Sequence, residues 1–343
     1  MKNTIITIDL AKSVFELAIV NQHYRITRRL RLDRQGFTEF MNQQSPAIVV
    51  MEACGSSHHW GRQFREQGHE VVLLPVQYVR PYRRRNKTDR ADCEAMLEAY
   101  RCDGMKPVAV KSLEQQELQL MHRLREQWKQ TRVKRLNFLR GVFREQGIPL
   151  PAGEREALRE ANAHVGRLSS LSLQLLQPVL AELKTLESDM QALEQQIARL
   201  TRGNETVANL QTIPGIGLLI SSAFVAAIGK AEQFQSGRQL ASWLGITPRE
   251  HSSGNRRLLG SITKKGNVYL RTLLVHGARS ALVAAKRRAK AGKPLTRLQS
   301  WAIGLELRVG HNKATVALAN KLARIIWACW TSGKPYQANH CPA

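Results

Sequence analysis

Five short apolar runs lie within the first 76 residues, and their pattern constrains the fold more than any other feature of the chain. The runs are Ile5–Asp9, Phe15–Val20, Tyr24–Leu32, Ala47–Glu52 and Glu70–Val76. Runs of this length and composition are typical of β-strands, and helix-like stretches at Arg34–Gln43 and Ser57–Gln67 separate the later ones. Such strands are expected to form a mixed sheet whose faces are covered by the helices. We therefore predict an α/β domain over residues 1–110.

The middle of the chain favours long helices. Ser112 and Gln115 have the spacing of a capping box, and an amphipathic pattern follows to about Gln146. A second helical stretch, from about residue 154 to residue 200, carries apolar residues at alternating spacings of three and four. They are Leu183, Leu186, Met190, Leu193, Ile197 and Leu200. This seam is typical of a coiled coil, formed either with the preceding helix or with a second copy of the chain. Residues 111–203 are therefore predicted as a helical coiled-coil region.

The last region, residues 204–335, is predicted to be mostly helical and strongly basic, closing with a helix at Lys313–Ser332. The segment Lys286–Lys293 (KRRAKAGK) has the composition of a solvated basic link. Ile213–Gly217 (IPGIG) resembles the hairpin of a helix–hairpin–helix, in which Gly215 and Gly217 allow backbone N–H groups to approach a phosphate. A plain tight turn between two helices is the alternative interpretation.

The net charge indicates the partner. The chain of 343 residues has 52 Lys and Arg against 27 Asp and Glu, which gives a net charge of +25. A protein this basic repels itself unless it meets a polyanion, so we expect nucleic acid. A cationic loop at residues 77–90 supplies candidate contacts. They are Arg83, Arg84, Arg85 and Lys87.

The cysteines and the apolar stretches bear on localisation. The five cysteines are Cys54, Cys93, Cys102, Cys329 and Cys341. Their odd number and lack of paired metal spacing favour a reducing compartment. The pattern of the first residues indicates a strand rather than a signal peptide. The apolar stretch at residues 217–229 is too short to cross a bilayer. We expect a cytoplasmic protein with no membrane contact.

Four acids are placed where a metal site would need them. Asp9 and Glu52 end the first and fourth predicted strands, while Asp89 and Asp92 share one face at the start of a helix predicted over residues 89–100. If these strands are neighbours, the four carboxylates converge and need a cation between them. Hard oxygen ligands favour Mg²⁺, with Mn²⁺ as a substitute. Each acid alone also has an ordinary role, such as capping a turn or offsetting a helix dipole.

A serine in the last region lies among cations. Ser252 and Ser253 precede Gly254 in the segment GITPREHSSG. The cations nearby are Arg249, Arg256, Arg257, Lys264 and Lys265. This setting suits a hydroxyl that attacks a phosphodiester, because cations hold the phosphate and stabilise developing charge. A serine beside a glycine is more often a simple turn residue.

The motifs IDLAK, MEACG and NKTDRADCEA, followed by IPGIG, LASWLGITPREHSSG and KKGNVYLR, resemble the DEDD insertion-sequence transposases. This is the IS110 family, which includes the Piv-type DNA invertases. The resemblance covers about residues 5–330. It implies a RuvC-like, ribonuclease-H-fold domain whose acids bind Mg²⁺, and a C-terminal transposase domain whose serine forms a phosphoserine link to DNA. That serine falls on Ser253, with Ser252 adjacent. Cys93 departs from the small alanine expected there.

The resemblance implies partners as well. Family members join element ends to target sites in double-stranded DNA, act as multimers (here a dimer or tetramer), and use a composite site made by both domains. Several are guided by a structured noncoding "bridge" RNA, and they work in the bacterial cytoplasm, at the nucleoid. Two alternatives remain: a RuvC-like metal-dependent endonuclease that uses water as nucleophile, and a non-enzymatic nucleic-acid-binding protein. A related class, the ATP-dependent sugar kinases, lacks support because no glycine-rich phosphate loop of that kind is found.

Overall fold

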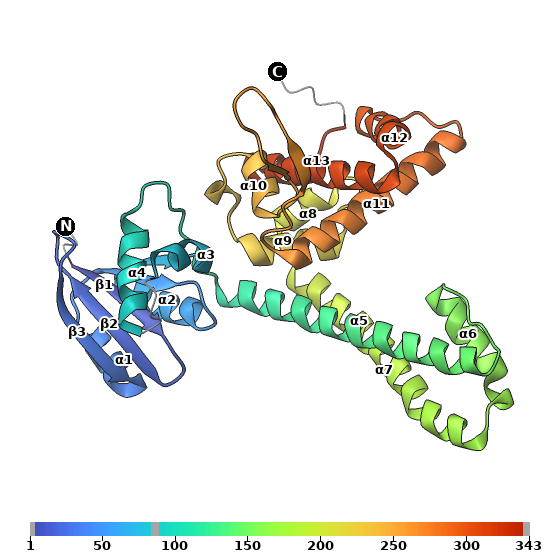
Figure 1. The fold of residues 1–343 in the computed structure, drawn as a ribbon, viewed down its shortest axis with the longest axis horizontal. Helices are drawn as coiled ribbons and strands as arrows, with labels where there is room; N and C mark the ends of the chain where they lie inside the picture. Colours follow the sequence, from blue (N-terminus) through green and yellow to red (C-terminus); the bar gives the residue numbers. More distant parts are fainter. Residues whose placement is uncertain (1–3, 84–88, 339–343) are drawn as a thin grey trace. The chain divides into compact units, whose positions relative to one another are not determined.

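The structure, a computed structural model, describes residues 4–83 and 89–338 and divides into two compact units (Figure 1). The first comprises residues 1–116 together with Ile228–Gln233. The second comprises Glu117–Ala227 and residues 234–343. The predicted boundary between a middle and a C-terminal domain falls within this second unit.

The first unit is built on a five-stranded sheet, which confirms the predicted mixed α/β fold. The strands are β1 (Ile5–Leu10), β2 (Val14–Val20), β3 (Ile26–Asp33), β4 (Ile48–Glu52) and β5 (Glu70–Leu74). Their order is β3-β2-β1-β4-β5, in which β1, β2 and β3 are antiparallel while β4 and β5 run parallel to β1. Strand β1 is therefore the direct neighbour of β4, as the metal-site prediction requires.

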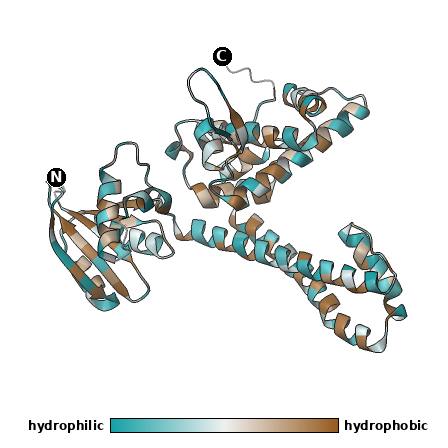
Figure 2. Ribbon diagram, viewed as in Figure 1, coloured by the Kyte–Doolittle hydropathy of each residue, from teal (hydrophilic) through white to brown (hydrophobic). Residues whose placement is uncertain are grey.

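Helices cover both faces of this sheet. One face packs against α1 (Arg34–Asn42) and α2 (Ser57–Glu66), where Phe15, Phe37 and Trp60 form an aromatic cluster. The other face packs against α4 (Asp89–Arg101), which contributes buried side chains such as Met96. Strands β1, β2, β4 and β5 bury side chains against these helices, which explains why they are largely apolar and mostly brown in Figure 2. The edge strand β3 differs, because it has no fully buried residue and carries three arginines.

The segment before α4 differs from the prediction of a continuous loop over residues 77–90. A short helix α3 (Val76–Val79) and a 3₁₀ turn η1 (Arg80–Tyr82) follow β5 directly. Val79 is fully buried in the core beneath α4, and this apolar anchor makes the chain turn rather than extend. Arg84, Arg85 and Lys87 lie outside the described residues.

The long helices of the second unit form an antiparallel pair. Helix α5 (Leu113–Glu145) runs beside α7 (Ser170–Leu200), with α6 (Glu154–His164) and the turn η2 (Val165–Arg167) between them in the chain. Arg125 pairs with Glu194 near one end and Arg135 pairs with Glu182 nearer the other. Five of the six seam residues are buried, whereas Leu200 is 41% exposed. The seam packs within the chain, which is the first of the two alternatives; self-association remains a prediction.

The remaining helices of the second unit gather around α13 (His311–Ser332), which contacts α8, α10, α11 and α12. Their bounds are α8 (Glu205–Gln211), α9 (Leu218–Ile228), α10 (Gly237–Trp243), α11 (Val268–Lys290) and α12 (Arg297–Val309). A 3₁₀ turn η3 (Ala231–Gln233) follows α9. The predicted basic link at residues 286–293 is wrong over its first half. Lys286 and the residues up to Lys290 continue α11, because buried Leu282 and Ala285 hold this end of the helix against the core.

The region predicted to be mostly helical also contains a two-stranded hairpin, β6 (Pro248–Glu250) and β7 (Leu259–Ile262). The exposed loop between the strands carries Ser252 and Ser253. Over residues 4–83 and 89–338, no helix combines the length and the apolar character needed to cross a bilayer.

Candidate active site

Asp9 and Glu52 occupy matching positions on neighbouring strands. In the parallel register of β1 and β4, Ile8 pairs with Met51, so Asp9 and Glu52 each take the next position. Side chains alternate along a strand, which places both carboxylates on the sheet face covered by α4. Both residues are half-buried. The strand ends therefore bring together the first two of the four predicted acids.

Helix α4 supplies the third carboxylate that the structure describes. Asp92 lies in its first turn and is only 6% exposed, on the side that faces the sheet. Asp89 begins the same helix, but its side chain lies outside the described residues. The prediction that Asp89 joins this cluster therefore stays a prediction.

One guanidinium group joins two of these acids. Nη2 of Arg83 donates to Oε1 and Oε2 of Glu52 at 3.2 and 3.0 Å. Nε of the same side chain lies 2.9 Å from Oδ1 of Asp92, close enough for an ion pair but without the alignment of a hydrogen bond. Arg83 was predicted to contact nucleic acid; here it neutralises the carboxylate cluster.

The donor atoms suit a divalent cation. Among the residues that the structure describes, no three His, Cys, Asp or Glu side chains form a ready-made ligand set. The buried Oδ1 of Asp92 nevertheless has no hydrogen-bond partner there, and Glu52 is satisfied only by a cation. Oxygen-only ligands around a positive charge are the chemistry that Mg²⁺ prefers. Mg²⁺ is therefore compatible with Asp9, Glu52 and Asp92, and the side chain of Asp89 lies outside the described residues.

A fifth acid in this cluster was not predicted. Glu16 pairs directly with Asp9 across the antiparallel β1–β2 register and is 7% exposed, on the same sheet face. Its carboxylate lies 3.8 Å from Nε of Arg90. A lone acid within the apolar strand FELAIV was a signal in the sequence, because buried acids need a partner or a function.

Cys93 lies beside the acids without being a ligand. Its thiol is fully buried and donates to the backbone oxygen of Glu16 at 3.3 Å. Burial raises the pKa of this thiol to about 12. The group is therefore a neutral thiol that fills space in the core.

The two adjacent serines differ in their environment. Oγ of Ser252 donates to Oε1 of Glu250 at 2.7 Å and accepts the N–H of Leu258 at 3.2 Å. Ser253 pairs with Arg256 through backbone hydrogen bonds alone, and within the described part of the chain no partner is found for its hydroxyl. The Ser252 hydroxyl therefore makes hydrogen bonds within the hairpin, while the exposed Ser253 hydroxyl makes none to the described residues.

The predicted cations of this region line the hairpin and the turn after it. All are exposed: Arg249, Arg256, Arg257, Lys264 and Lys265. Arg257 pairs with Glu250 at 3.4 Å, and Arg249 reaches the backbone oxygen of Thr263 at 3.5 Å. Arg256 and Arg257 thus lie in the serine loop itself, whereas Lys264 and Lys265 follow β7 at the other end of the hairpin.

The IPGIG turn joins α8 to α9, and its first glycine has a packing role. Gly215 has φ +84°, and a Cβ there would lie 2.3 Å from the backbone oxygen of Gly277 on α11. Gly217 has no atom within 4 Å of such a position. The close approach at Gly215 is thus to another helix of the same unit, and phosphate binding at this turn remains a prediction.

A mixed sheet with carboxylates at adjacent strand ends is consistent with the ribonuclease-H-like enzymes that act on phosphodiesters. Family models identify the group within that class. Residues 6–147 match the DEDD transposase model of the IS110 type, and residues 207–293 match the transposase model of the IS116/IS110/IS902 family. The chain belongs to this family of transposases, enzymes that cleave and rejoin DNA.

Relatives extend over nearly the whole chain. A probable family 20 transposase of Pseudomonas aeruginosa is 42% identical, covering 94% of this chain and 95% of its own length. The transposase for insertion sequence element IS1111A of Coxiella burnetii is 35% identical, covering 97% and 91%. A pilin gene-inverting protein of Moraxella bovis is 25% identical, covering 74% and 75%.

Proposed function

We propose that the chain is the transposase of an IS110-family insertion sequence and that its chemistry combines a divalent metal centre with a serine nucleophile. Asp9, Glu52, Asp89 and Asp92 hold Mg²⁺, and Ser253 attacks the DNA backbone. The observation that carries the metal assignment is the pair of carboxylates, Glu52 and Asp92, drawn together by one cation at the strand ends.

When bound, Mg²⁺ neutralises charge on the phosphate that is cleaved. The protein's own groups do the rest of the positioning. Strands β1 and β4 fix Asp9 and Glu52 on rigid backbone, and α4 brings Asp92 to them. A site on regular elements holds its ligands more firmly than one on loops. Carboxylates gathered at one edge of the sheet also favour a bound cation, because their like charges repel each other.

The serine step conserves the energy of the bond that breaks. Oγ of Ser253 forms a bond to phosphorus while the phosphorus–oxygen bond to the deoxyribose breaks, and the proton of the hydroxyl passes by way of solvent to the leaving oxygen. A hydroxyl of the exchanged strand then forms a bond to phosphorus while the phosphorus–Oγ bond breaks, and its proton passes by way of solvent to Oγ of Ser253. Ser253 is favoured as the nucleophile because its hydroxyl is exposed and makes no hydrogen bond to the described residues. The hydroxyl of Ser252 is already hydrogen-bonded to Glu250 and to the N–H of Leu258.

The partners follow from the family and the charge. Double-stranded DNA at the element ends and the target is the substrate, and a structured noncoding RNA is the proposed guide. A net charge of +25 is compatible with neutralising two nucleic acids at once. We further propose that the active form is a dimer or tetramer in the bacterial cytoplasm, nucleoid-associated when it acts.

A cleavage assay on DNA that carries the element's own ends tests this function. Asp92→Asn is expected to abolish cleavage in Mg²⁺, while Glu98→Gln, which changes an exposed acid of the same helix, keeps it. Joined products with no free hydrolysed ends support the recombinase. Hydrolysed ends without joining would instead favour the metal-dependent endonuclease that uses water.

A further inference from the structure

Helix α11 is unusual in its charge. Its 23 residues, VYLRTLLVHGARSALVAAKRRAK, include no acid. The cations are Arg271, Arg279, Lys286, Arg287, Arg288 and Lys290, with His276 as an additional titratable group. Its buried side is apolar, through residues such as Leu274, Ala278 and Leu282. A helix with one apolar side and only basic charges on the rest of its surface is typical of a surface that meets a polyanion.

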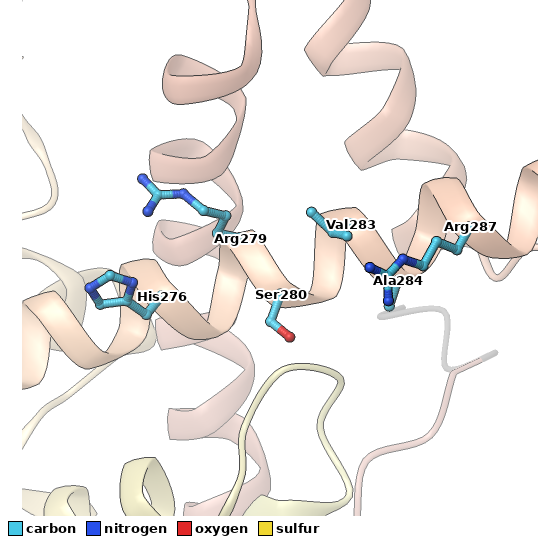
Figure 3. A pocket seen from close by; sticks show the side chains of 6 residues that line it. All are labelled: His276, Arg279, Ser280, Val283, Ala284 and Arg287. Atoms are coloured by element: carbon cyan, nitrogen blue, oxygen red, sulfur yellow. The ribbon is translucent and has the colours of Figure 1, made fainter. Parts of the chain in front are cut away.

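A shallow groove of about 580 Å³ lies along this helix. Its lining residues are His276, Arg279, Ser280, Val283, Ala284 and Arg287. Figure 3 shows all six on the single helix, with the short side chains of Ser280, Val283 and Ala284 between the two arginines. Short side chains between cations leave room for a bulky anion to approach the helix closely.

The two arginines of the groove are not used inside the protein. Arg271 donates to the backbone oxygen of Leu244 at 2.9 Å, and Lys286 pairs with Glu306 at 2.9 Å. By contrast, within residues 4–83 and 89–338 neither Arg279 nor Arg287 has an ion pair or a side-chain hydrogen bond. Both are exposed. Arginines that are not held by the fold keep all their donors for a ligand.

The spacing of the cations fits a nucleic-acid strand. Arg287 lies eight positions after Arg279 in the helix, a rise of about 12 Å at 1.5 Å per residue. Phosphates of one DNA strand recur about every 3.4 Å along the duplex axis, so this rise spans three to four phosphates at roughly that repeat. Guanidinium groups grip phosphate oxygens in a fork, and the backbone they contact carries no sequence information.

From these observations we propose that the α11 groove binds the phosphate backbone of double-stranded DNA without reading its sequence. Arg279 and Arg287 are the contacts at its two ends. The inference takes DNA as the partner from the proposed function, but it needs neither the metal nor the serine. It can therefore hold or fail independently of the cleavage chemistry.

The test is the salt dependence of DNA binding, measured in EDTA so that no cleavage occurs. Fluorescence anisotropy of a labelled duplex of arbitrary sequence gives the affinity of the full chain. For the double variant Arg279→Gln with Arg287→Gln, the slope of log K against log salt should be smaller by about 2, one unit for each lost phosphate contact. The variant Arg279→Lys with Arg287→Lys keeps the charges and should regain most of the slope.

The matched control removes two exposed arginines from other helices of the same unit, Arg144→Gln with Arg155→Gln. It lowers the net charge equally and should leave the slope unchanged. Equal losses in the two double variants would overturn the proposal, since net charge alone would then explain them. So would a loss confined to a labelled RNA duplex, because the surface would then serve RNA. Unchanged thermal unfolding of each variant shows that folding is intact.

Discussion

Arg83 donates to both carboxylate oxygens of Glu52, at 3.2 and 3.0 Å. With Asp92 at 2.9 Å from its Nε, this one side chain provides the positive charge that a metal ion would bring. In the proposed site, a bound Mg²⁺ would therefore compete with the guanidinium group for the same two carboxylates.

This competition predicts how Arg83→Gln affects stability. In the absence of Mg²⁺, the variant has no cation beside Glu52 and Asp92. We expect its free energy of unfolding to fall by about 1–2 kcal/mol. This value is reduced for solvent screening, because the ion pair is partly exposed. Mg²⁺ should then stabilise the variant more than the unmodified protein, as measured by thermal unfolding across a Mg²⁺ titration. Arg101→Gln, which breaks an exposed pair with Glu98 on α4, is the control. Equal Mg²⁺ shifts in all three proteins would contradict the account.

Glu16 is expected to strengthen metal binding from its place beside Asp9. Glu16→Gln removes one negative charge from the cluster with little change in shape, so the affinity for Mn²⁺ should fall about tenfold, the range typical of groups that support metal ligands. Titration of the protein followed by the electron paramagnetic resonance of free Mn²⁺ measures this. Glu98→Gln is the control on α4. An unchanged affinity would mean that Glu16 serves the fold alone.

The two glycines of the IPGIG turn should respond differently to alanine. Gly215→Ala places a methyl group against Gly277 at a positive φ, so we expect a loss of about 3 kcal/mol in the free energy of unfolding. Gly217→Ala meets open space and should change stability by about 0.5 kcal/mol at most. Urea unfolding compares them. If Gly217→Ala is stable yet binds DNA more weakly, the turn does contact phosphate; if DNA affinity is unchanged, the turn is structural.

A buried histidine predicts how stability depends on pH. Nδ1 of His122 lies 3.0 Å from the hydroxyl of Tyr269, and Nε2 lies 3.0 Å from Oγ of Ser222, which ties α5 to α11 and α9. Burial, aided by Arg125, lowers the pKa of His122 to about 4, from 6.5 in the unfolded chain. Between these two pH values the unfolded state therefore binds more protons than the folded state. The free energy of unfolding is highest above pH 6.5 and decreases as the pH falls toward 4.

The His122→Gln variant isolates this contribution. Between pH 7.5 and pH 5, the unmodified protein should lose about 2 kcal/mol more than the variant in its free energy of unfolding. Urea titrations at the two pH values measure the difference. Burial also lowers the pKa of His58 to about 4. Because both proteins contain His58, its contribution to the pH dependence cancels in the comparison. Equal losses would show that His122 titrates normally in the folded state.

Much of the first unit could be predicted from the sequence, because its strands and helices carry strong local patterns. Asp9 and Glu52 were predicted from their places at strand ends, and β1 does lie beside β4. Glu16 was missed because its importance arises only from the antiparallel register with Asp9. The role of Arg83 depends on how the chain turns after β5, which no local pattern specifies.

The second unit shows where sequence patterns are insufficient. The seam around Met190 indicated a helical partner, but it takes the ion pairs and the apolar contacts with α5 to identify which one. Residues 286–290 have the composition of a linker, yet packing through Ala285 keeps them helical. The β6–β7 hairpin has few apolar residues, so its strands depend on backbone pairing rather than on a hydrophobic pattern. The difference between Ser252 and Ser253 depends on that pairing.

The most direct test of the account is to trap the protein–DNA link and locate it. The full chain is incubated with DNA carrying the element ends in Mg²⁺, denatured and digested, and the peptide joined to nucleotide is sequenced by mass spectrometry. We predict a phosphodiester on Ser253, absent from Ser253→Ala and Asp92→Asn and retained in Ser252→Ala. A link that persists when both serines are replaced by alanine, or cleavage and joining without any link, would contradict the serine mechanism.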